Sequence, residues 1–237
     1  MLAVKEPRVL IVGAGCTGAY VSRALRRRLP SESVVVWESS SYVGGRMRTE
    51  YAQLPDGNAV RSDTGAQYIT QDGRVAAAHE AIYAALRTAG VLVPFQGDIE
   101  GTRAADGGGA NYVCPEGLGA LVEHVLSEAG VTPICNRCVE SLHHRQDTEG
   151  TSAQWEVQPS DGPAERFDAV LLTAPVPQQL QLLGQSGLEE WVEPQPRAQM
   201  DKLQYSARCA PIPFRHHSYG GRAGLYWGRA GLRSPWI

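Results

Sequence analysis

The chain has 237 residues, of which 43% are hydrophobic and 20% are charged, enough for one large or two small globular domains. No apolar stretch reaches the length of a membrane-spanning helix, and the first seven residues are too polar for a cleaved signal peptide. The net charge of −3 gives no electrostatic reason to bind nucleic acid or an anionic membrane. We therefore expect a cytoplasmic protein with neither nucleic acid nor a membrane as a partner.

The amino-terminal segment has the pattern of a dinucleotide-binding βαβ unit. An apolar strand ending at Val12 leads into a G-x-G-x-x-G run, and residues 19–29 can form the helix that follows. Gly13 allows a tight turn, Gly15 lets a pyrophosphate approach the backbone, and Gly18 lets the helix pack against the sheet. The free N–H groups of the helix N-terminus would face the phosphates.

A second apolar run, residues 34–37, ends directly at Glu38, twenty residues after the last glycine. A carboxylate at this place can accept both hydroxyl protons of an adenosine ribose, so Glu38 is the predicted ribose ligand. The same carboxylate would repel a 2′-phosphate. An NADP-type adenosine is therefore disfavoured in this pocket.

Two further segments favour a flavin over a nicotinamide cofactor. Gly44 and Gly45 can let the chain pass close to a cofactor, and Arg46 offers a cationic fork for a pyrophosphate or a flavin edge. The segment 63–68, with sequence DTGAQY, follows some twenty residues later. Together these two segments argue against an NAD-dependent dehydrogenase.

This set of segments resembles the flavin-dependent amine oxidase superfamily. The similarity continues in colinear order to about residue 210, through the segments 114–117, 167–177 and 205–208. The resemblance implies an α/β fold, with a Rossmann-like FAD/NAD(P)-binding domain and an incomplete α+β substrate domain in the p-hydroxybenzoate hydroxylase-like architecture. It divides the chain into a cofactor domain (1–74 and 111–178), a partial substrate domain (75–110 and 179–210) and a divergent tail (211–237).

The resemblance also implies that the cofactor is FAD, and that it contacts residues beyond the glycine run and Glu38. These are Thr17, Gly44, Gly45, Arg46, Gln67, Tyr68 and Thr173, with Val139 at the adenine. Tyr68 could equally be a core aromatic residue. No metal site and no catalytic acid, base or nucleophile is assigned, since His79 and His124 fall within expected helices and His216 and His217 within the tail.

Other periodic segments predict packing elements. A helix is expected over 74–89, with a buried face of Val75, Ala78, Ile82, Ala85, Leu86 and Ala89, and another over 118–129, ended by Gly130. Strands are expected at 131–135, as the third Rossmann strand, and at 167–173, with an antiparallel ribbon at 155–158. Gly107, Gly108 and Gly109 suggest a hairpin or loop, and Arg26, Arg27 and Arg28 a solvated helix end.

The five cysteines, an odd number, fit a reducing compartment better than a disulfide framework. The spacing of Cys135 and Cys138 is not a common zinc pattern, so both are expected to be buried core residues. The superfamily resemblance leaves secretion open as an alternative to the cytoplasm, and the oligomeric state is not determined by the sequence.

The tail from Pro211 onward differs in composition, because it holds four of the 22 basic residues and none of the 25 acidic ones. It repeats the motif GRAGL and lacks helical or strand periodicity, which indicates disorder or non-native sequence. We expect a truncated or alternatively spliced form without the rest of the substrate-domain sheet and the final flavin-binding glycine motif.

Two functions follow from these expectations. The first is an FAD-dependent oxidase that takes a hydride from a small-molecule substrate, a misreduced NAD(P)H isomer or an amine, and passes the electrons to O₂ to give H₂O₂. The alternative is a noncatalytic truncated isoform that binds FAD weakly or not at all.

Overall fold

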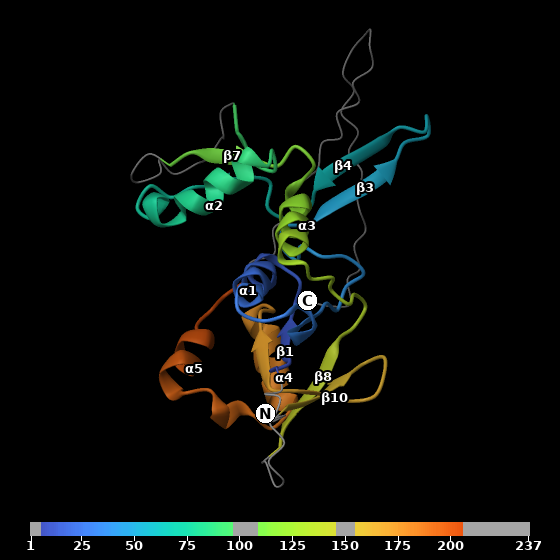
Figure 1. Cartoon of the computed structure of the whole chain (residues 1–237), viewed down its shortest axis with the longest axis vertical. Coiled ribbons are helices and arrows are strands. Elements are labelled where there is room, and N and C mark those ends of the chain that lie inside the picture. The colour runs from blue at the N-terminus through green and yellow to red at the C-terminus, as the bar shows by residue number, and fades with distance from the viewer. Residues whose placement is uncertain (1–5, 97–108, 146–154, 206–237) are drawn as a thin grey trace, which may run out of the picture.

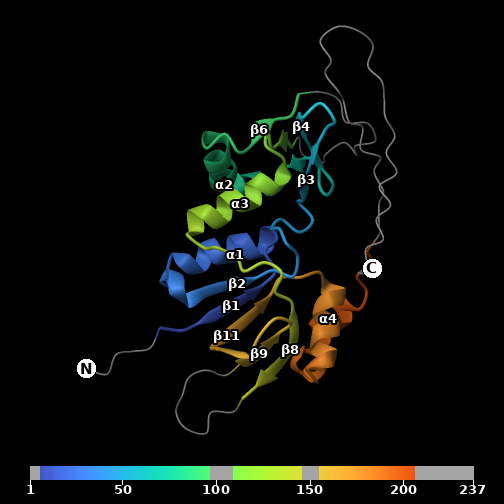
Figure 2. The same ribbon diagram turned by 90° about the vertical axis from the view of Figure 1, so that its right-hand side faces the viewer.

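The computed structural model describes residues 6–96, 109–145 and 155–205. Figures 1 and 2 show an elongated molecule with a lower part, which contains strand β1 (Val9–Val12) and helix α1 (Cys16–Arg26), and an upper part, which contains helices α2 (Ala76–Thr88) and α3 (Leu118–Ala129). Helices α1 and α3 pack against each other where the two parts meet. The predicted tail (211–237) and Gly107 and Gly108 of the predicted hairpin lie outside the described residues.

A three-stranded parallel sheet forms the centre of the lower part. Its strands are β11 (Ala169–Leu172), β1 (Val9–Val12) and β2 (Val34–Trp37), in that order. Helix α1 (Cys16–Arg26) connects β1 to β2, with the short 3₁₀ helix η1 (Ser31–Ser33) before β2. The βαβ unit is thus as predicted, although α1 begins within the glycine run rather than after it.

The predicted third Rossmann strand at 131–135 is wrong as a full strand. Only Ile134 bridges Trp37 in parallel, through hydrogen bonds from Ile134 N to Val36 O (2.8 Å) and from Glu38 N to Ile134 O (2.9 Å). The pairing ends there because Asn136 leaves the extended conformation, at φ 58°, and Arg137 N rather than Asn136 N then donates to Glu38 O. The chain still runs beside β2 on the side expected of a Rossmann fold.

An antiparallel sheet packs against the parallel one and confirms the ribbon predicted at 155–158. Its strands are β10 (Glu165–Phe167), β9 (Trp155–Pro159) and β8 (Val139–His144). Helix α4 (Val176–Gln185) packs on β8, followed by η2 (Glu189–Trp191) and α5 (Pro194–Met200). The shared core contains Leu10, Trp37, Val139, Leu142, Val157, Phe167, Leu182 and Leu188.

The upper part contains two small antiparallel sheets and two helices (Figure 1). Strands β3 (Thr49–Gln53) and β4 (Ala59–Asp63) form a hairpin, while β5 (Ile69–Thr70), β7 (Asn111–Val113) and β6 (Val93–Pro94) form the other sheet. The helices are α2 (Ala76–Thr88) and α3 (Leu118–Ala129).

Helix α3 confirms its prediction, and helix α2 only in part. The face of α3 that contains Leu121, Val122 and Val125 is buried, and Gly130 ends the helix in the left-handed conformation at φ 62°. In α2 only Leu86 is fully buried, and Ile82 packs beside it. The other residues of the predicted buried face are exposed: Val75, Ala78, Ala85 and Ala89. Alanine side chains are too small to decide which face of a helix is buried. The prediction of a buried face that included three alanines was therefore wrong for all but Ile82 and Leu86.

The N-terminus of α3 is closed by side chains from the β3–β4 hairpin. Asp63 Oδ1 accepts hydrogen bonds from Leu118 N (2.8 Å) and Thr49 Oγ1 (2.6 Å), and Thr49 Oγ1 accepts one from Gly119 N (3.0 Å). These contacts satisfy helix N–H groups that would otherwise lack partners. They also fix the hairpin to the helix.

We expect Asp63→Ala to lower the free energy of unfolding by about 1–2 kcal/mol, because Leu118 N–H and the Thr49 hydroxyl both lose their acceptor. Asp201→Ala is the matched control. Asp201 is exposed and pairs only with Arg197 on one helix face, so its loss should cost less than about 0.5 kcal/mol. Urea unfolding measures both values, and equal losses would contradict the capping role of Asp63.

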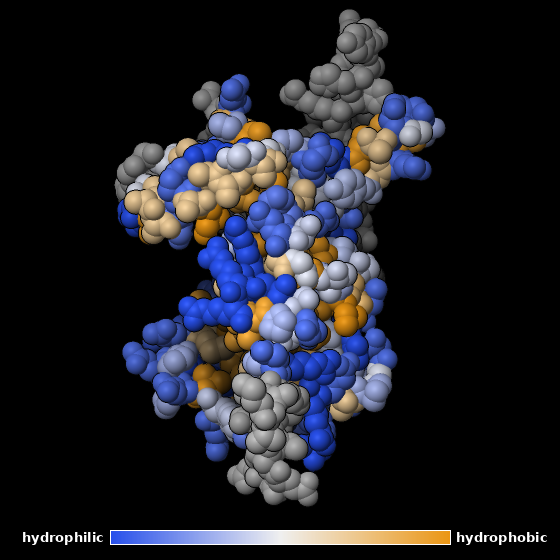
Figure 3. Space-filling view, viewed as in Figure 1, coloured by the Kyte–Doolittle hydropathy of each residue, from blue (hydrophilic) through white to orange (hydrophobic). Residues whose placement is uncertain are grey.

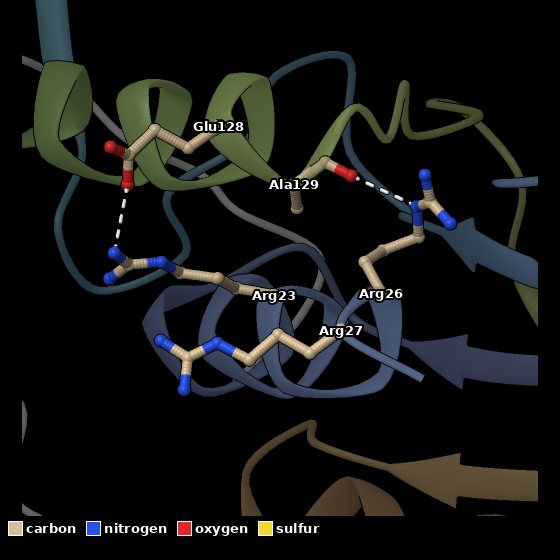
Figure 4. Close-up of a pocket in the computed structure, with 5 residues that line it drawn as sticks. All are labelled: Arg23, Arg26, Arg27, Glu128 and Ala129. Atoms are coloured by element: carbon tan, nitrogen blue, oxygen red, sulfur yellow. Dashed lines mark hydrogen bonds and ion pairs between the residues drawn. The ribbon is translucent and has the colours of Figure 1, made fainter. Parts of the chain in front are cut away.

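The arginines at the end of α1 are not simply a solvated helix end. Figure 4 shows Arg26 directed to the end of α3, where its Nε donates to Ala129 O at 3.1 Å, and Arg23 directed to Glu128, at 3.3 Å. Figure 3 shows this surface over α1 as strongly hydrophilic. Arg23 and Arg26 therefore join the carboxyl ends of two helices, where positive charge also offsets the helix dipoles.

Candidate cofactor site

Strand register brings three predicted site residues to one edge of the parallel sheet. Val12 pairs with both Trp37 and Leu172, so the residues that follow these strands lie at the same level. Gly13 N donates to Trp37 O (2.8 Å), and Thr173 N donates to Val12 O (2.9 Å). Gly13, Glu38 and Thr173 are therefore neighbours, at the edge where parallel sheets bind their ligands.

The Thr173 side chain hydrogen-bonds to the backbone at the turn of the glycine loop. Its hydroxyl lies 2.9 Å from Val12 O and 3.0 Å from Gly13 O, within donating distance of either. Gly13 has φ 107°, and a Cβ there would lie 2.9 Å from Thr173 Oγ1. Both the backbone conformation and the close packing require glycine. Thr173 thus acts on the loop, whether or not it also touches a cofactor.

Helix α1 has an open N-terminus. Its N-cap, Gly15, forms no side-chain hydrogen bond, its first turn has no acidic residue, and Thr17 is exposed. Helix α3 is the contrasting case, because Asp63 and Thr49 close its N-terminus. Free N–H groups and the positive end of the helix dipole make the α1 terminus suited to an anion.

Gly15 and Gly18 are glycines for different reasons. A Cβ on Gly18 would lie closer than 3.0 Å to Gly13 O, so this position needs glycine for the helix to pack against the loop. A Cβ on Gly15 would meet only Gly44 O, at 3.9 Å, which is ordinary contact. The protein itself therefore does not require glycine at Gly15, and the open space beside it is available to a ligand.

The Glu38 carboxylate is nearly buried, with 9% of the residue exposed, and is held by several donors. Its Oε2 accepts from Ala14 N in the glycine loop at 2.8 Å. Its Oε1 accepts from Ser40 N (2.9 Å) and from Ser40 Oγ (2.7 Å). The sequence pattern did not predict Ala14 or Ser40 as partners, since neither spacing nor residue type signals these contacts.

The predicted Gly44-Gly45-Arg46 segment lies directly against the glycine loop. Gly44 N donates to Ala14 O at 2.9 Å, and Gly15 and Gly44 form a parallel bridge. Gly44 and Gly45 have φ 112° and 55°, conformations that favour glycine. The exposed Arg46 side chain forms no hydrogen bond or ion pair with any described residue. Its guanidinium is therefore free to bind an anion near Gly15.

The segment 64–66 lies beside residues 46–48, so that the next two predicted cofactor contacts, Gln67 and Tyr68, follow close to Arg46 in the structure. Thr64 N donates to Arg48 O (3.0 Å) and Ala66 N to Arg46 O (2.9 Å). Gln67 and Tyr68 follow at once, and both are exposed. Tyr68 is 38% exposed, so its alternative reading as a core aromatic residue is wrong.

Val139 and the two nearby cysteines differ from each other in burial. Val139 is buried in the core with Trp37. It lies two residues after Arg137, whose backbone N–H donates to Glu38 O at 2.8 Å.

Cys135 is half-buried and Cys138 exposed, so the expectation of buried core cysteines is wrong. Neighbouring protein atoms still desolvate the sulfur atoms of both residues in part, which raises the pKa of both thiols. The described residues contain no cluster suited to a metal ion.

Comparison with known proteins agrees with this geometry. Residues 11–86 match the family model of an NAD(P)-binding Rossmann-like domain. Two solved structures share the fold at 14% identity: a candidate protoporphyrinogen oxidase from Exiguobacterium sp. 255-15 (TM-score 0.53, covering 77% of this chain and 62% of that one) and PF1083 protein from Pyrococcus furiosus (0.51, 84% and 66%). Fold and family model thus define a protein with a Rossmann-like domain of the NAD(P)-binding kind.

Renalase of Mus musculus is 33% identical to this chain over 221 residues. The alignment covers 93% of the chain and 61% of renalase, so the chain spans about three fifths of the length of that relative. The chain is a homologue of renalase, which confirms the resemblance inferred from its motifs. No helix among the described residues combines the length and apolar character needed to cross a bilayer.

Proposed function

We propose that the chain is a flavin-dependent oxidoreductase that binds FAD at the carboxyl edge of the parallel sheet. The observation that carries the proposal is the open N-terminus of α1, in hydrogen-bonded contact with a second glycine segment, Gly44-Gly45. Both segments leave backbone open to an anionic ligand, and the next residue, Arg46, supplies a cation that pairs with none of the residues the structure describes.

In this proposal each part of the site holds one part of the cofactor. The N–H groups at the start of α1 and the open space at Gly15 would receive the pyrophosphate, with Arg46 as its counter-ion. Glu38 would accept from the ribose. Gln67 and Tyr68 would lie toward the flavin and Val139 toward the adenine, while Thr173 would support the loop from below.

When bound, FAD supplies the redox chemistry by accepting a hydride and passing the electrons to O₂, which gives H₂O₂. The chain contributes binding and orientation of the cofactor and of a small-molecule substrate, a misreduced dihydronicotinamide dinucleotide or an amine. The division into a cofactor domain (1–74 and 111–178) and a partial substrate domain (75–110 and 179–210) stays a prediction. A noncatalytic truncated isoform that binds FAD weakly or not at all is the alternative.

The proposal predicts that Gly15→Ala weakens FAD binding by tenfold or more, because the new methyl group occupies the space where the pyrophosphate approaches the backbone, a steric loss of about 1.4 kcal/mol or more. Fluorescence titration with FAD measures the affinity. Gly162→Ala is the matched control, since a Cβ there would lie 3.6 Å from the Arg137 guanidinium, an ordinary contact outside the site.

Both substitutions should leave the urea unfolding midpoint close to that of the wild type, so lost binding cannot be ascribed to lost folding. If Gly15→Ala binds FAD as tightly as Gly162→Ala, the cofactor site is not at this loop. If FAD binds but no dihydronicotinamide isomer or amine reduces it, the noncatalytic alternative holds.

A further inference from the structure

Ser40 occupies an acceptor position that the Glu38 carboxylate would otherwise offer to a ligand. A carboxylate has two oxygens and about four acceptor positions in all. Oε1 already accepts from Ser40 N (2.9 Å) and Ser40 Oγ (2.7 Å), with the exposed Ser39 hydroxyl a more distant donor at 3.3 Å. Among the residues the structure describes, Ala14 N alone donates to Oε2, at 2.8 Å. One acceptor position therefore remains, and it is on Oε2.

The hydroxyl proton of Ser40 has two acceptors within reach, Glu38 Oε1 at 2.7 Å and Tyr42 O at 2.9 Å. A hydroxyl carries one proton, and a hydrogen bond to a carboxylate is shorter and stronger than one to a neutral carbonyl. The shorter of the two distances is the one to Glu38. The Ser40 hydroxyl therefore donates its hydrogen bond to the Glu38 carboxylate.

The backbone of Ser40 is itself fixed from the other side. Asn136 N donates to Ser40 O at 2.9 Å, and Arg137 N donates to Glu38 O at 2.8 Å. Among the described residues, Asn136 is the one non-glycine residue with positive φ, at 58°, which lets the 135–138 loop turn over this segment. Because both ends of the segment are held, the backbone of Ser40 stays in place beside the carboxylate, and the hydroxyl lies between its two acceptors, Glu38 Oε1 and Tyr42 O.

We propose that Ser40 is a positioning residue that limits Glu38 to one ribose hydroxyl, so that the site recognises only one of the two hydroxyls of an adenosine ribose. This inference rests on the proposed function, because it concerns the adenosine half of the same cofactor. It departs from the prediction made from the sequence, in which Glu38 accepts from both hydroxyls. Removing the Ser40 hydroxyl frees a position on Oε1 for the second one.

The test is isothermal titration calorimetry of the full chain with ADP, 2′-deoxy-ADP and 3′-deoxy-ADP. Wild-type protein should bind one deoxy nucleotide about tenfold more weakly than ADP and the other as tightly as ADP, since a hydrogen bond to a charged group is lost in one case only. Ser40→Ala should bind both deoxy nucleotides more weakly than ADP. Ser40→Thr keeps the hydroxyl and should restore the wild-type pattern.

Ser39→Ala is the matched control, because the Ser39 side chain is exposed and its hydroxyl is the more distant donor, so the wild-type pattern should persist. Equal weakening of both deoxy nucleotides in the wild type would overturn the inference while leaving the ribose contact of Glu38 intact. Weakening of neither would overturn the inference and the ribose contact together. A wild-type pattern in Ser40→Ala would overturn it too. Failure of ADP to bind the wild type at all would overturn the proposed function with it.

Discussion

Gly18→Ala should destabilise the folded chain by about 2 kcal/mol or more, even though alanine favours helices over glycine by about 1 kcal/mol. Gly18 lies in the first turn of α1, and a Cβ there would be closer than 3.0 Å to Gly13 O and 3.2 Å from Thr173 Oγ1. The first of these atoms belongs to the backbone of a tight turn. It cannot move without displacing the whole loop.

Gly15→Ala is the control for this prediction, because it places the same methyl group in the same loop without a close contact. Urea unfolding should show a lower midpoint for Gly18→Ala and an almost unchanged midpoint for Gly15→Ala. A Gly18→Ala protein as stable as the wild type would show that α1 does not pack on the loop as described.

Trp37→Ala should lower the free energy of unfolding by about 3–5 kcal/mol, the usual cost of emptying a large aromatic site in a core. Trp37 is 1% exposed and packs edge-on against Phe167, with ring centroids 5.5 Å apart. The guanidinium of Arg137 lies 4.3 Å from the Trp37 ring centroid and also pairs with Glu165 at 2.8 Å. The substitution therefore removes apolar packing and a cation–π contact together.

Trp191→Ala is the matched control, since Trp191 is 55% exposed and its ring contacts lie at the surface. Its loss should cost less than about 1.5 kcal/mol. If Trp37→Ala does not fold, Trp37→Phe keeps an aromatic ring in the core and should fold, with an unfolding midpoint below that of the wild type. Similar losses for Trp37→Ala and Trp191→Ala would contradict the assignment of the core.

The local parts of the fold could be predicted because their signals are local. Strand β1, the glycine run and helix α1 follow one another within twenty residues, and each has a residue pattern of its own. Helix α3 has large aliphatic residues at helical spacing and a glycine at its end. Glu38 could be placed from its position after β2 alone.

The contacts that complete the site depend on tertiary structure, which the residue pattern does not contain. Ala14 meets Glu38 because β1 and β2 pair in register, and Asp63 meets Leu118 across 55 positions in the chain. The Ser40 contact is local, two residues from Glu38, but a serine at that spacing has no pattern of its own. The β3–β4 hairpin had a local signal that was overlooked, the Asp56-Gly57 pair between its strands. The strand predicted at 131–135 is reduced to a bridge at Ile134, because Asn136 leaves the extended conformation at φ 58°.

The central claim is that the glycine loop, Glu38 and the Gly44-Gly45-Arg46 segment together hold a flavin dinucleotide. The absorption spectrum of the purified chain, loaded with FAD and then desalted, tests it most directly. We expect the wild-type protein to retain the flavin bands and the Gly15→Ala protein to lose them. A folded wild-type protein that elutes without flavin would contradict the claim.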